Sequence, residues 1–301
     1  MQTAPDTSAR IQYPTWTASA LLAGGVVAAS SSPILVRYAE GAEPLAISFW
    51  RCLVGALVLL PFARGGLRRV GRRQAWLCAV AGIFLAVHFA TWITSLGLTT
   101  VAASVLLVST TPIFVALVAP WVVRERLTLV GWTGIALALG GTILIAGLDF
   151  GGSSLTGNLL ALAGGAAAAG YVLAGRLARK DLSIVPYAVL TYGVATVFLG
   201  LACFADDVPL TGYPAGTWWA IAALIVGPQL LGHTVINLVL SRIDATTVSV
   251  SLMAEPVIAT VAAAWLFDEI PTSVFYLGGA AILIGIFVVS TNQRPEELAP
   301  A

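Results

Sequence analysis

The sequence predicts an all-α integral membrane protein, with ten transmembrane helices forming two inverted five-helix repeats around a central cavity. The first observation is composition, because 58% of the 301 residues are hydrophobic and only 10% are charged. Such a chain is far more apolar than soluble domains are. The second observation is that the charges are clustered, which leaves apolar windows long enough to span a bilayer. The third is an internal duplication around Pro112 and Pro256.

Apolar segments of transmembrane length follow one another along the chain. In a first repeat, residues 15–148, we expect helices at 15–37, 44–62, 74–97, 101–123 and 128–148. In a second repeat, residues 154–292, we expect helices at 156–177, 183–204, 215–241, 245–267 and 272–291. The first segment is too long for the core of a signal peptide, so we expect it to be retained as a span. The two repeats together make one membrane domain.

The duplication predicts how the two halves are related. With an offset of 144 residues and no gap, the matching pairs are Pro112 and Pro256, Trp121 and Trp265, Glu125 and Glu269, Gly134 and Gly278, and Gly141 and Gly285. Because each half has an odd number of spans, the second half must enter the membrane in the opposite orientation. Inverted repeats with prolines at matching helix positions are typical of secondary transporters, whose binding site lies near the midplane between the repeats.

The charges in the short loops predict the orientation in the membrane. The loop after the second segment is strongly basic and should lie in the cytoplasm, since it carries Arg64, Arg68, Arg69, Arg72 and Arg73. Counting spans from this loop places both termini on the cytoplasmic side of a bacterial inner membrane. The loops on the opposite side are mainly acidic, and Arg37 is their only basic residue.

Composition and motifs exclude several other classes of protein. A net charge of +1 and a pI near 7.7 leave no basic face for nucleic acid. No nucleophile motif, phosphate-binding loop or zinc signature occurs, so we expect no enzyme activity, no cofactor and no metal. Cys52, Cys78 and Cys203 are widely spaced within apolar segments and are expected to be small buried residues without a disulfide. Without an ATP-binding motif, any transport must use gradients or exchange.

Several residues resemble the signature positions of a known family. They are Trp50-Arg51, Pro112 followed by Glu125-Arg126, and Glu255-Pro256 followed by Asp268-Glu269. Together with the glycine-rich fifth and tenth segments, they resemble the EamA-type fold of the drug/metabolite transporter superfamily over nearly the whole chain. Among carriers of this type, the chain resembles bacterial amino-acid exporters of the YddG type. The resemblance implies a ten-helix carrier with a central cavity, usually for the export of small metabolites.

Two ionisable residues inside the predicted spans are candidates for the binding site. Arg51 either offers paired donors to a substrate carboxylate, or forms a structural ion pair, or reaches the outer surface. Glu255 either binds a substrate ammonium or carries a coupling proton, or it bonds the carbonyls that Pro256 leaves unpaired. The residue that matches Glu255 in the first repeat is Thr111. The symmetric feature is therefore the proline rather than the charge, which favours the structural role over proton coupling.

Aromatic residues deep in the spans form a second group. His88 and His233 precede the matching prolines by 24 and 23 residues. They either face one cavity or make ordinary interhelical bonds. Trp50 and Trp92 lie deeper than the other tryptophans, which fit an interfacial belt. With Tyr171 and Tyr192 they either line a pocket for an apolar or aromatic side chain or pack helices together.

Polar residues beside prolines complete the candidates. The predicted helix breaks are at Pro33, Pro112, Pro228 and Pro256. The serines and threonines that precede the first two prolines either expose backbone donors to a carboxylate or bond their own helix. Gln229 and Asn237 are eight residues apart on one helix face and are expected to point inward.

These residues predict a binding site walled by the first, third, fourth, sixth, eighth and ninth helices. The predicted substrate-binding residues are Trp50, Arg51, His88, Trp92, Thr111, Tyr171, Gln229, His233, Asn237 and Glu255. We expect a secondary-active exporter of small amphipathic metabolites, with amino acids that include apolar and aromatic ones as cargo, working as a monomer by alternating access.

Two rival functions stay open. One is efflux of lipophilic cations or drugs, with Glu255 as their anionic partner. The other is a non-transporting polytopic membrane protein, either an enzyme or a sensor. The sequence shows neither the acid/base pairs of such an enzyme nor the soluble output domain of such a sensor.

Overall fold

The structure, a computed structural model, describes residues 15–146, 154–258, 261–262 and 273–292, and all structural statements below concern them. Nine helical stretches of this part of the chain are long and apolar enough to cross a membrane. A shorter apolar stretch, Ala245–Ile258, occupies the position of the predicted ninth span, whose expected continuation to residue 267 lies mainly outside the described residues. The all-α membrane fold predicted from composition is therefore confirmed.

The first repeat consists of α1 (Thr15–Ala29), α2 (Ser32–Tyr38), α3 (Pro44–Leu67), α4 (Arg72–Leu98), α5 (Val101–Val108), α6 (Thr111–Val122) and α7 (Leu129–Ala146). The second repeat consists of α8 (Leu155–Arg179), α9 (Ile184–Ala205), α10 (Ala215–Leu224), the π-helix η1 (Ile225–His233), α11 (Thr234–Val239), α12 (Ala245–Ser251), the 3₁₀-helix η2 (Leu252–Ala254) and α14 (Ser273–Thr291). The predicted boundaries agree with these to within a few residues.

Four predicted helices are interrupted rather than continuous. Two of the breaks separate α1 from α2 and α5 from α6, and Pro33 and Pro112 stand in the first turn of the helices that follow. A proline suits this position because its missing N–H would have no intrahelical partner there. The hydroxyls of Ser31 and Thr110 donate to carbonyls three residues earlier, at 2.8 and 2.6 Å. The ordinary alternative for these hydroxyls, bonding their own helix, is therefore the one observed.

The other two interrupted helices change their winding at a proline. Pro228 lies inside η1, where its missing N–H and its ring are accommodated by the wider π-helical turn. Pro256 lies two residues after the end of η2, the tighter 3₁₀ turn, and Glu255 stands between them. Such changes of winding often mark functional hinges. All four predicted helix-break prolines thus coincide with a local break or change of helix.

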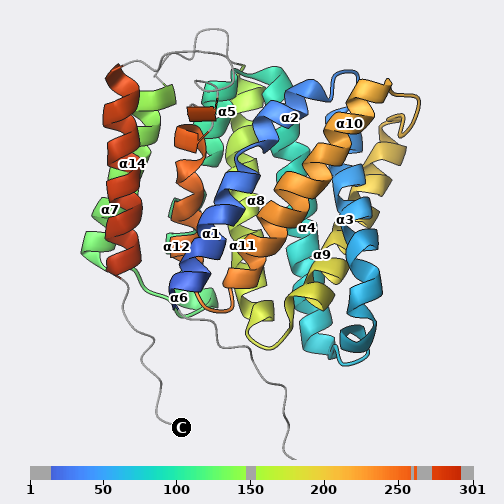
Figure 1. Ribbon diagram of the computed structural model, residues 1–301, viewed down its shortest axis with the longest axis horizontal. Helices are drawn as coiled ribbons and strands as arrows, with labels where there is room; N and C mark the ends of the chain where they lie inside the picture. The colour runs from blue at the N-terminus through green and yellow to red at the C-terminus, as the bar shows by residue number, and fades with distance from the viewer. Residues whose placement is uncertain (1–14, 147–153, 259–260, 263–272, 293–301) are drawn as a thin grey trace, which may run out of the picture.

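The two repeats run in opposite directions. In Figure 1, α1 begins at the lower end of the molecule and continues upward to α2, whereas α8 begins at the upper end and runs downward. Glycine contacts show the same symmetry. A Cβ on Gly134 would lie 2.9 Å from the carbonyl oxygen of Gly285, and one on Gly141 would lie 2.4 Å from that of Gly278. Exchanging the matched residues of the repeats converts one contact into the other, as a two-fold axis between inverted repeats requires.

Equivalent helices pack in equivalent ways. α3 packs on α9, α6 on α12, and α7 on α14, so the second, fourth and fifth spans each contact their own counterpart. α4 packs on α8, and the equivalent pair in the other half is α1 with η1 and α11. In a bilayer such packing depends on close approach of small residues, because lipid tails are as apolar as the helices themselves.

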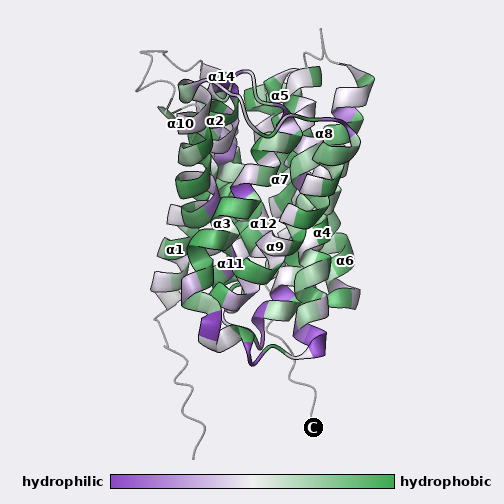
Figure 2. Cartoon of the chain, turned by 90° about the vertical axis from the view of Figure 1, so that its right-hand side faces the viewer, coloured by the Kyte–Doolittle hydropathy of each residue, from purple (hydrophilic) through white to green (hydrophobic). Residues whose placement is uncertain are grey.

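Charged loops gather at one end of the molecule. The lower end in Figure 1, called the basic end below, holds the α3–α4, α6–α7, α8–α9 and α11–α12 connections, and Figure 2 shows hydrophilic residues concentrated there below an apolar middle. The first and last described helices, α1 and α14, also begin and end at this side. The basic loops thus share one end, as the loop charges predict. Which side of the membrane that end faces stays a prediction.

Candidate functional site

A central cavity of about 90 Å³ lies between the repeats, at the level of the helix breaks. Its wall contains residues from α1, α2, α4, α5, α6, α8, η1, α11, α12 and η2, which belong to the six spans expected from the sequence. Pro112 and the residue before Pro256 are both on this wall. The interrupted helices thus face the cavity, where freed backbone groups can be satisfied without contacting lipid.

Aromatic and imidazole rings make up much of the wall. Nδ1 of His88 lies 2.9 Å from the carbonyl oxygen of Gly164, and its ring stacks on Trp92 at a centroid distance of 5.8 Å and an interplanar angle of 2°. His233 lies 6.0 Å from Tyr171, measured between ring centroids. All four rings line the cavity. Both histidines thus line one cavity, and His88 also makes the interhelical bond that was the alternative.

Thr111 and Glu255, which match each other in the repeats, both line the cavity. The hydroxyl of Thr111 donates to the carbonyl oxygens of Val108 and Gly165, at 2.7 and 3.0 Å. Glu255 differs, because its Oε1 is buried and has no hydrogen-bond partner among the described residues. This carboxyl oxygen is therefore not bonded to the carbonyls left free by the proline that follows it. A polar group of this kind on a cavity wall is available to a ligand.

Arg51 lies just behind the wall and is fully buried, with an exposure of 0%. Its Nη1 donates to the hydroxyl of Ser32 at 3.1 Å, and its Cζ lies 4.3 Å from the ring centroid of Phe89. Its Nε and Nη2 have no hydrogen-bond partner in the described part of the chain. Neither structural alternative for Arg51 is observed there, because the side chain does not reach the surface and no ion pair holds it.

Besides Arg51, three further predicted site residues lie off the cavity wall. Trp50 donates its indole N–H to the carbonyl oxygen of Leu210 at 2.8 Å and packs edge-on against Trp218, so in this structure it packs helices rather than lining the pocket. Asn237 donates to the hydroxyl of Tyr171 and thereby supports a wall residue. Gln229 does point inward, with 0% exposure, and both of its amide atoms lack partners among the described residues.

Other residues at or just behind the wall are not among the predicted substrate-binding residues. Ser32, Ser249 and Met253 line the cavity. Phe89 packs its ring between Arg51 and His233, at 4.3 Å and 5.2 Å. Ser32 belongs to a polar cluster beside a predicted break, which was a usable signal. The other three carry no local signal, because apolar and small residues occur throughout every span.

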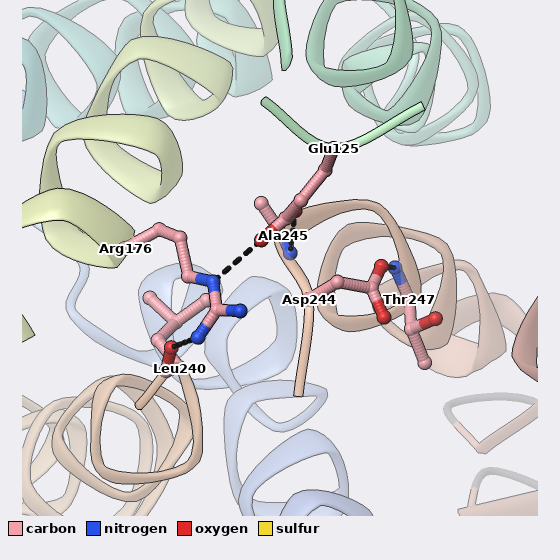
Figure 3. A network of polar contacts seen from close by, with 6 residues as sticks. All are labelled: Glu125, Arg176, Leu240, Asp244, Ala245 and Thr247. Atoms are coloured by element: carbon pink, nitrogen blue, oxygen red, sulfur yellow. Dashed lines mark hydrogen bonds and ion pairs between the residues drawn. The ribbon is translucent and has the colours of Figure 1, made fainter. Parts of the chain in front are cut away.

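A polar network at the basic end joins the two repeats (Figure 3). Glu125, in the turn between α6 and α7, accepts from Nε of Arg176 at 2.6 Å and from the backbone N–H of Ala245 at 2.9 Å. Arg176 also donates to the carbonyl oxygen of Leu240 at 2.6 Å. We call Glu125, Arg176 and Ala245 the inter-repeat latch. The duplication marks Glu125 in the sequence, but only the structure reveals its partners.

A second, larger space of about 770 Å³, the side cavity, lies between α1, α12 and α14. The ninth span lies between the two spaces and contributes residues to both. Ser249, Leu252, Met253 and Glu255 line the central cavity, and Thr247, Ser251, Ala254 and Ile258 line the side cavity. Asp244 and Thr247 line the side cavity. Burial raises the pKa of the Asp244 carboxyl, nearby Glu125 adds to the rise, and the bond from the Thr247 N–H, at 2.7 Å, opposes it.

Known proteins resemble this chain in sequence and in fold. The uncharacterized transporter YdfC of Bacillus subtilis (strain 168) is 27% identical over 267 residues, which cover 86% of this chain and 85% of that protein. An uncharacterized transporter of Archaeoglobus fulgidus is 26% identical over 82% of this chain and 87% of its own length. A solved crystal structure superposes with a TM-score of 0.75 over 91% of this chain and 98% of its own, at 19% identity. That likeness concerns the fold alone.

The family match covers both repeats. Residues 15–147 and 155–291 each match the EamA-like transporter family, and these bounds lie within a residue or two of the two repeats read from the sequence. The structure adds inverted halves, a cavity between them and interrupted helices on the cavity wall. The chain therefore belongs to the EamA-like transporter family, within the drug/metabolite transporter superfamily.

Proposed function

We propose that this transporter exports small zwitterionic metabolites, with apolar and aromatic amino acids as its main cargo, by alternating access. The observation that carries the proposal is the chemistry around the central cavity. Rings of histidine, tryptophan and tyrosine line the cavity together with Glu255, and Ser32 on its wall connects it to Arg51. An amino acid has a complementary group for each of these features: a side chain that packs on the rings, an ammonium for Glu255 and a carboxylate for Arg51.

The size of the cavity supports a cycle of conformations. About 90 Å³ is smaller than the roughly 300–1,000 Å³ of pockets that hold small ligands. Cargo therefore needs a state in which the cavity is wider. The broken spans supply the movable walls, because helix pieces joined at a break can tilt without breaking continuous hydrogen-bond ladders. The latch bonds the two repeats to each other at the basic end, so widening at that end requires the latch to open.

Direction follows from the proposed orientation. With the basic end in the cytoplasm of a bacterial inner membrane, both termini are cytoplasmic, and cargo enters at the latch and leaves at the opposite end. One chain suffices for this cycle, because the cavity lies between the two repeats of the same chain. On this proposal, the protein would work in the same way as amino-acid exporters of the YddG type.

A second candidate, efflux of lipophilic cations, is favoured by one observation, the unpartnered Oε1 of Glu255 in a largely apolar cavity. The two candidates differ in what Glu255 must do. Among the described residues of the wall, a cation has no other anionic partner, whereas a zwitterion is also held through its carboxylate. Replacing Glu255 with Gln should therefore abolish cation transport and only weaken amino-acid transport.

Counterflow in proteoliposomes tests the proposal. Vesicles loaded with unlabelled amino acid should accumulate the same labelled amino acid, across a panel of apolar, aromatic, polar and charged ones, and a lipophilic cation such as tetraphenylphosphonium should compete poorly. The panel is run with wild type, with Glu255→Gln and with protein-free vesicles. Flux equal to that of protein-free vesicles for every amino acid would reject the proposal. Accumulation of the cation alone, lost in Glu255→Gln, would establish the second candidate instead.

A further inference from the structure

Arg51 is the most unusual charged residue of the described chain. The guanidinium has five N–H donors and stays charged in proteins. Its exposure is 0%, and among the described residues it has one hydrogen bond, to the hydroxyl of Ser32 at 3.1 Å. Two of its nitrogens, Nε and Nη2, are buried without a partner. These two nitrogens lie on one edge of the guanidinium plane, which is the edge that binds a carboxylate through two parallel bonds.

A purely structural role does not account for this arrangement. Burying a charge without a counter-ion is strongly unfavourable, and even a buried ion pair is often no better for stability than apolar residues of similar volume. The cation–π contact with the ring of Phe89, whose centroid lies 4.3 Å from Cζ, offsets only part of the unfavourable free energy of burying the guanidinium. A methionine at position 51 would fill the same space without the loss. The charge is therefore retained for something other than the stability of this conformation.

The position of Arg51 connects it to the central cavity. Ser32, its hydrogen-bond partner, is itself on the cavity wall. Ser32 is also the first residue of α2, directly after the break that separates α2 from α1. On the other side, Phe89 packs against His233, which lines the cavity. One layer of side chains thus lies between the guanidinium and the cavity, and part of that layer stands at a helix break.

A further unpartnered side chain lies on the same side of α3. Gly55 is one helical turn after Arg51, and a Cβ at Gly55 would lie 3.1 Å from Cγ of Gln229. Gln229 is fully buried, and neither of its amide atoms has a partner among the described residues. A polar strip with spare donors therefore continues from Arg51 along the interface of α3 and η1.

We propose that Arg51 is the carboxylate-binding residue of the transport cycle, and that the substrate carboxylate replaces the hydroxyl of Ser32 as its partner when the α1–α2 break moves. The ligand class is a monocarboxylate, because one guanidinium balances one negative charge, whereas a phosphate dianion would require more buried cations. The proposal rests on the proposed function and adds the residue that selects the anionic group. Glu255, on a different helix of the wall, then faces the ammonium.

The test compares cargo with and without a carboxylate. Competition and counterflow are measured with L-phenylalanine and with L-phenylalaninamide, which has the same ring and ammonium but no negative charge. Wild type should prefer the amino acid. Arg51→Met should weaken binding of the amino acid by about 10- to 100-fold, the loss expected for a paired charge-assisted contact, and should leave the amide nearly unchanged. Arg51→Lys keeps the charge without the planar fork and should retain part of the preference.

Thermal unfolding in detergent separates this role from a structural one. If Arg51 serves substrate selection, Arg51→Met is as stable as wild type or more stable, since an unpaired buried charge has been removed. A loss of stability together with an equal loss of both cargoes would show a structural residue and overturn the proposal. Undiminished preference for the amino acid in Arg51→Met would overturn it as well.

Glu255→Gln provides the reciprocal variant. It should change discrimination between L-phenylalanine and 3-phenylpropionate, which lacks the ammonium, and should preserve discrimination against the amide. If it lost discrimination against the amide instead, the assignment of the two groups would be overturned. The failure of the proposed function looks different again, because wild type would then move neither phenylalanine nor any other amino acid of the panel. Equal transport of acid and amide by wild type would overturn the Arg51 assignment alone.

Discussion

Replacing Glu125 with Gln is expected to open the basic end of the transporter. The glutamine keeps the length and shape of the side chain but removes its charge. Its single amide oxygen can accept from either Arg176 or Ala245. Its amide nitrogen would then face the other N–H donor, from which it cannot accept a hydrogen bond. Since these bonds join the α6–α7 turn of the first repeat to α8 and α12 of the second, their loss weakens the state in which the basic end is closed.

The size of the effect follows from burial. The side chains of Arg176 and Glu125 are 13% and 16% exposed, so the pair is neither a surface pair nor a fully buried one. Exposed pairs contribute about 0.2–1 kcal/mol, and breaking a fully buried pair costs about 3–5 kcal/mol. An intermediate value of about 2 kcal/mol corresponds to a roughly 30-fold shift toward the open state, provided that the latch forms only in the closed state.

Cysteine accessibility measures this shift. The native cysteines, Cys52, Cys78 and Cys203, are buried and would be replaced by alanine to remove background labelling. A cysteine is then introduced at Ser249, which lines the central cavity on the helix that begins at the latch. Inverted membrane vesicles are treated with a membrane-impermeant maleimide. The labelling rate should rise in Glu125→Gln in proportion to the open population, up to about 30-fold.

The same end of the molecule offers a matched control. Arg73 and Asp181 form an ion pair at 3.4 Å whose side chains are 67% and 52% exposed. Asp181→Asn removes the same charge from the same face, but a solvent-exposed pair contributes little, so labelling should stay near the wild-type rate. If Glu125→Gln labels no faster than Asp181→Asn, the latch does not hold the basic end closed and the reasoning fails.

Two further changes have clear expectations. Gly141→Ala would place a Cβ 2.4 Å from the carbonyl oxygen of Gly278, so thermal unfolding should show a loss of about 1–3 kcal/mol, whereas Gly140→Ala, with nothing within 4 Å, should not destabilise. Equal melting temperatures for the two variants would contradict the close packing of α7 and α14. Because burial raises the pKa of Asp244 in the folded state, its contribution to stability is present at acidic pH and is lost as pH rises through the raised pKa. Asp244→Asn still caps α12, so its melting temperature relative to that of wild type should rise between acidic and neutral pH. A fall in this relative melting temperature over the same pH range would contradict the expected direction.

Local sequence patterns were enough to predict the membrane spans and the relation between the two repeats. Each span is recognisable by itself, because crossing a bilayer requires a long apolar window whatever its neighbours are. The duplication around Pro112 and Pro256 gave the inverted relation, since an odd number of spans in each half leaves no other orientation. The helices of the cavity wall followed from that symmetry and from the family resemblance. His88 and His233 could also be chosen as candidates without contact information, because each lies at nearly the same distance in sequence from its proline.

Only the tertiary structure decided what the polar residues touch. Trp50 and Arg51 are neighbours in sequence, yet Trp50 binds a loop carbonyl 160 residues away, whereas Arg51 lies behind the cavity wall with no counter-ion in the described part of the chain. Glu125 finds its partners 51 and 120 residues further along the chain. The physical reason is range. Hydrophobicity acts on each segment separately, whereas a hydrogen bond or an ion pair exists only where two side chains from distant segments meet within about 3 Å.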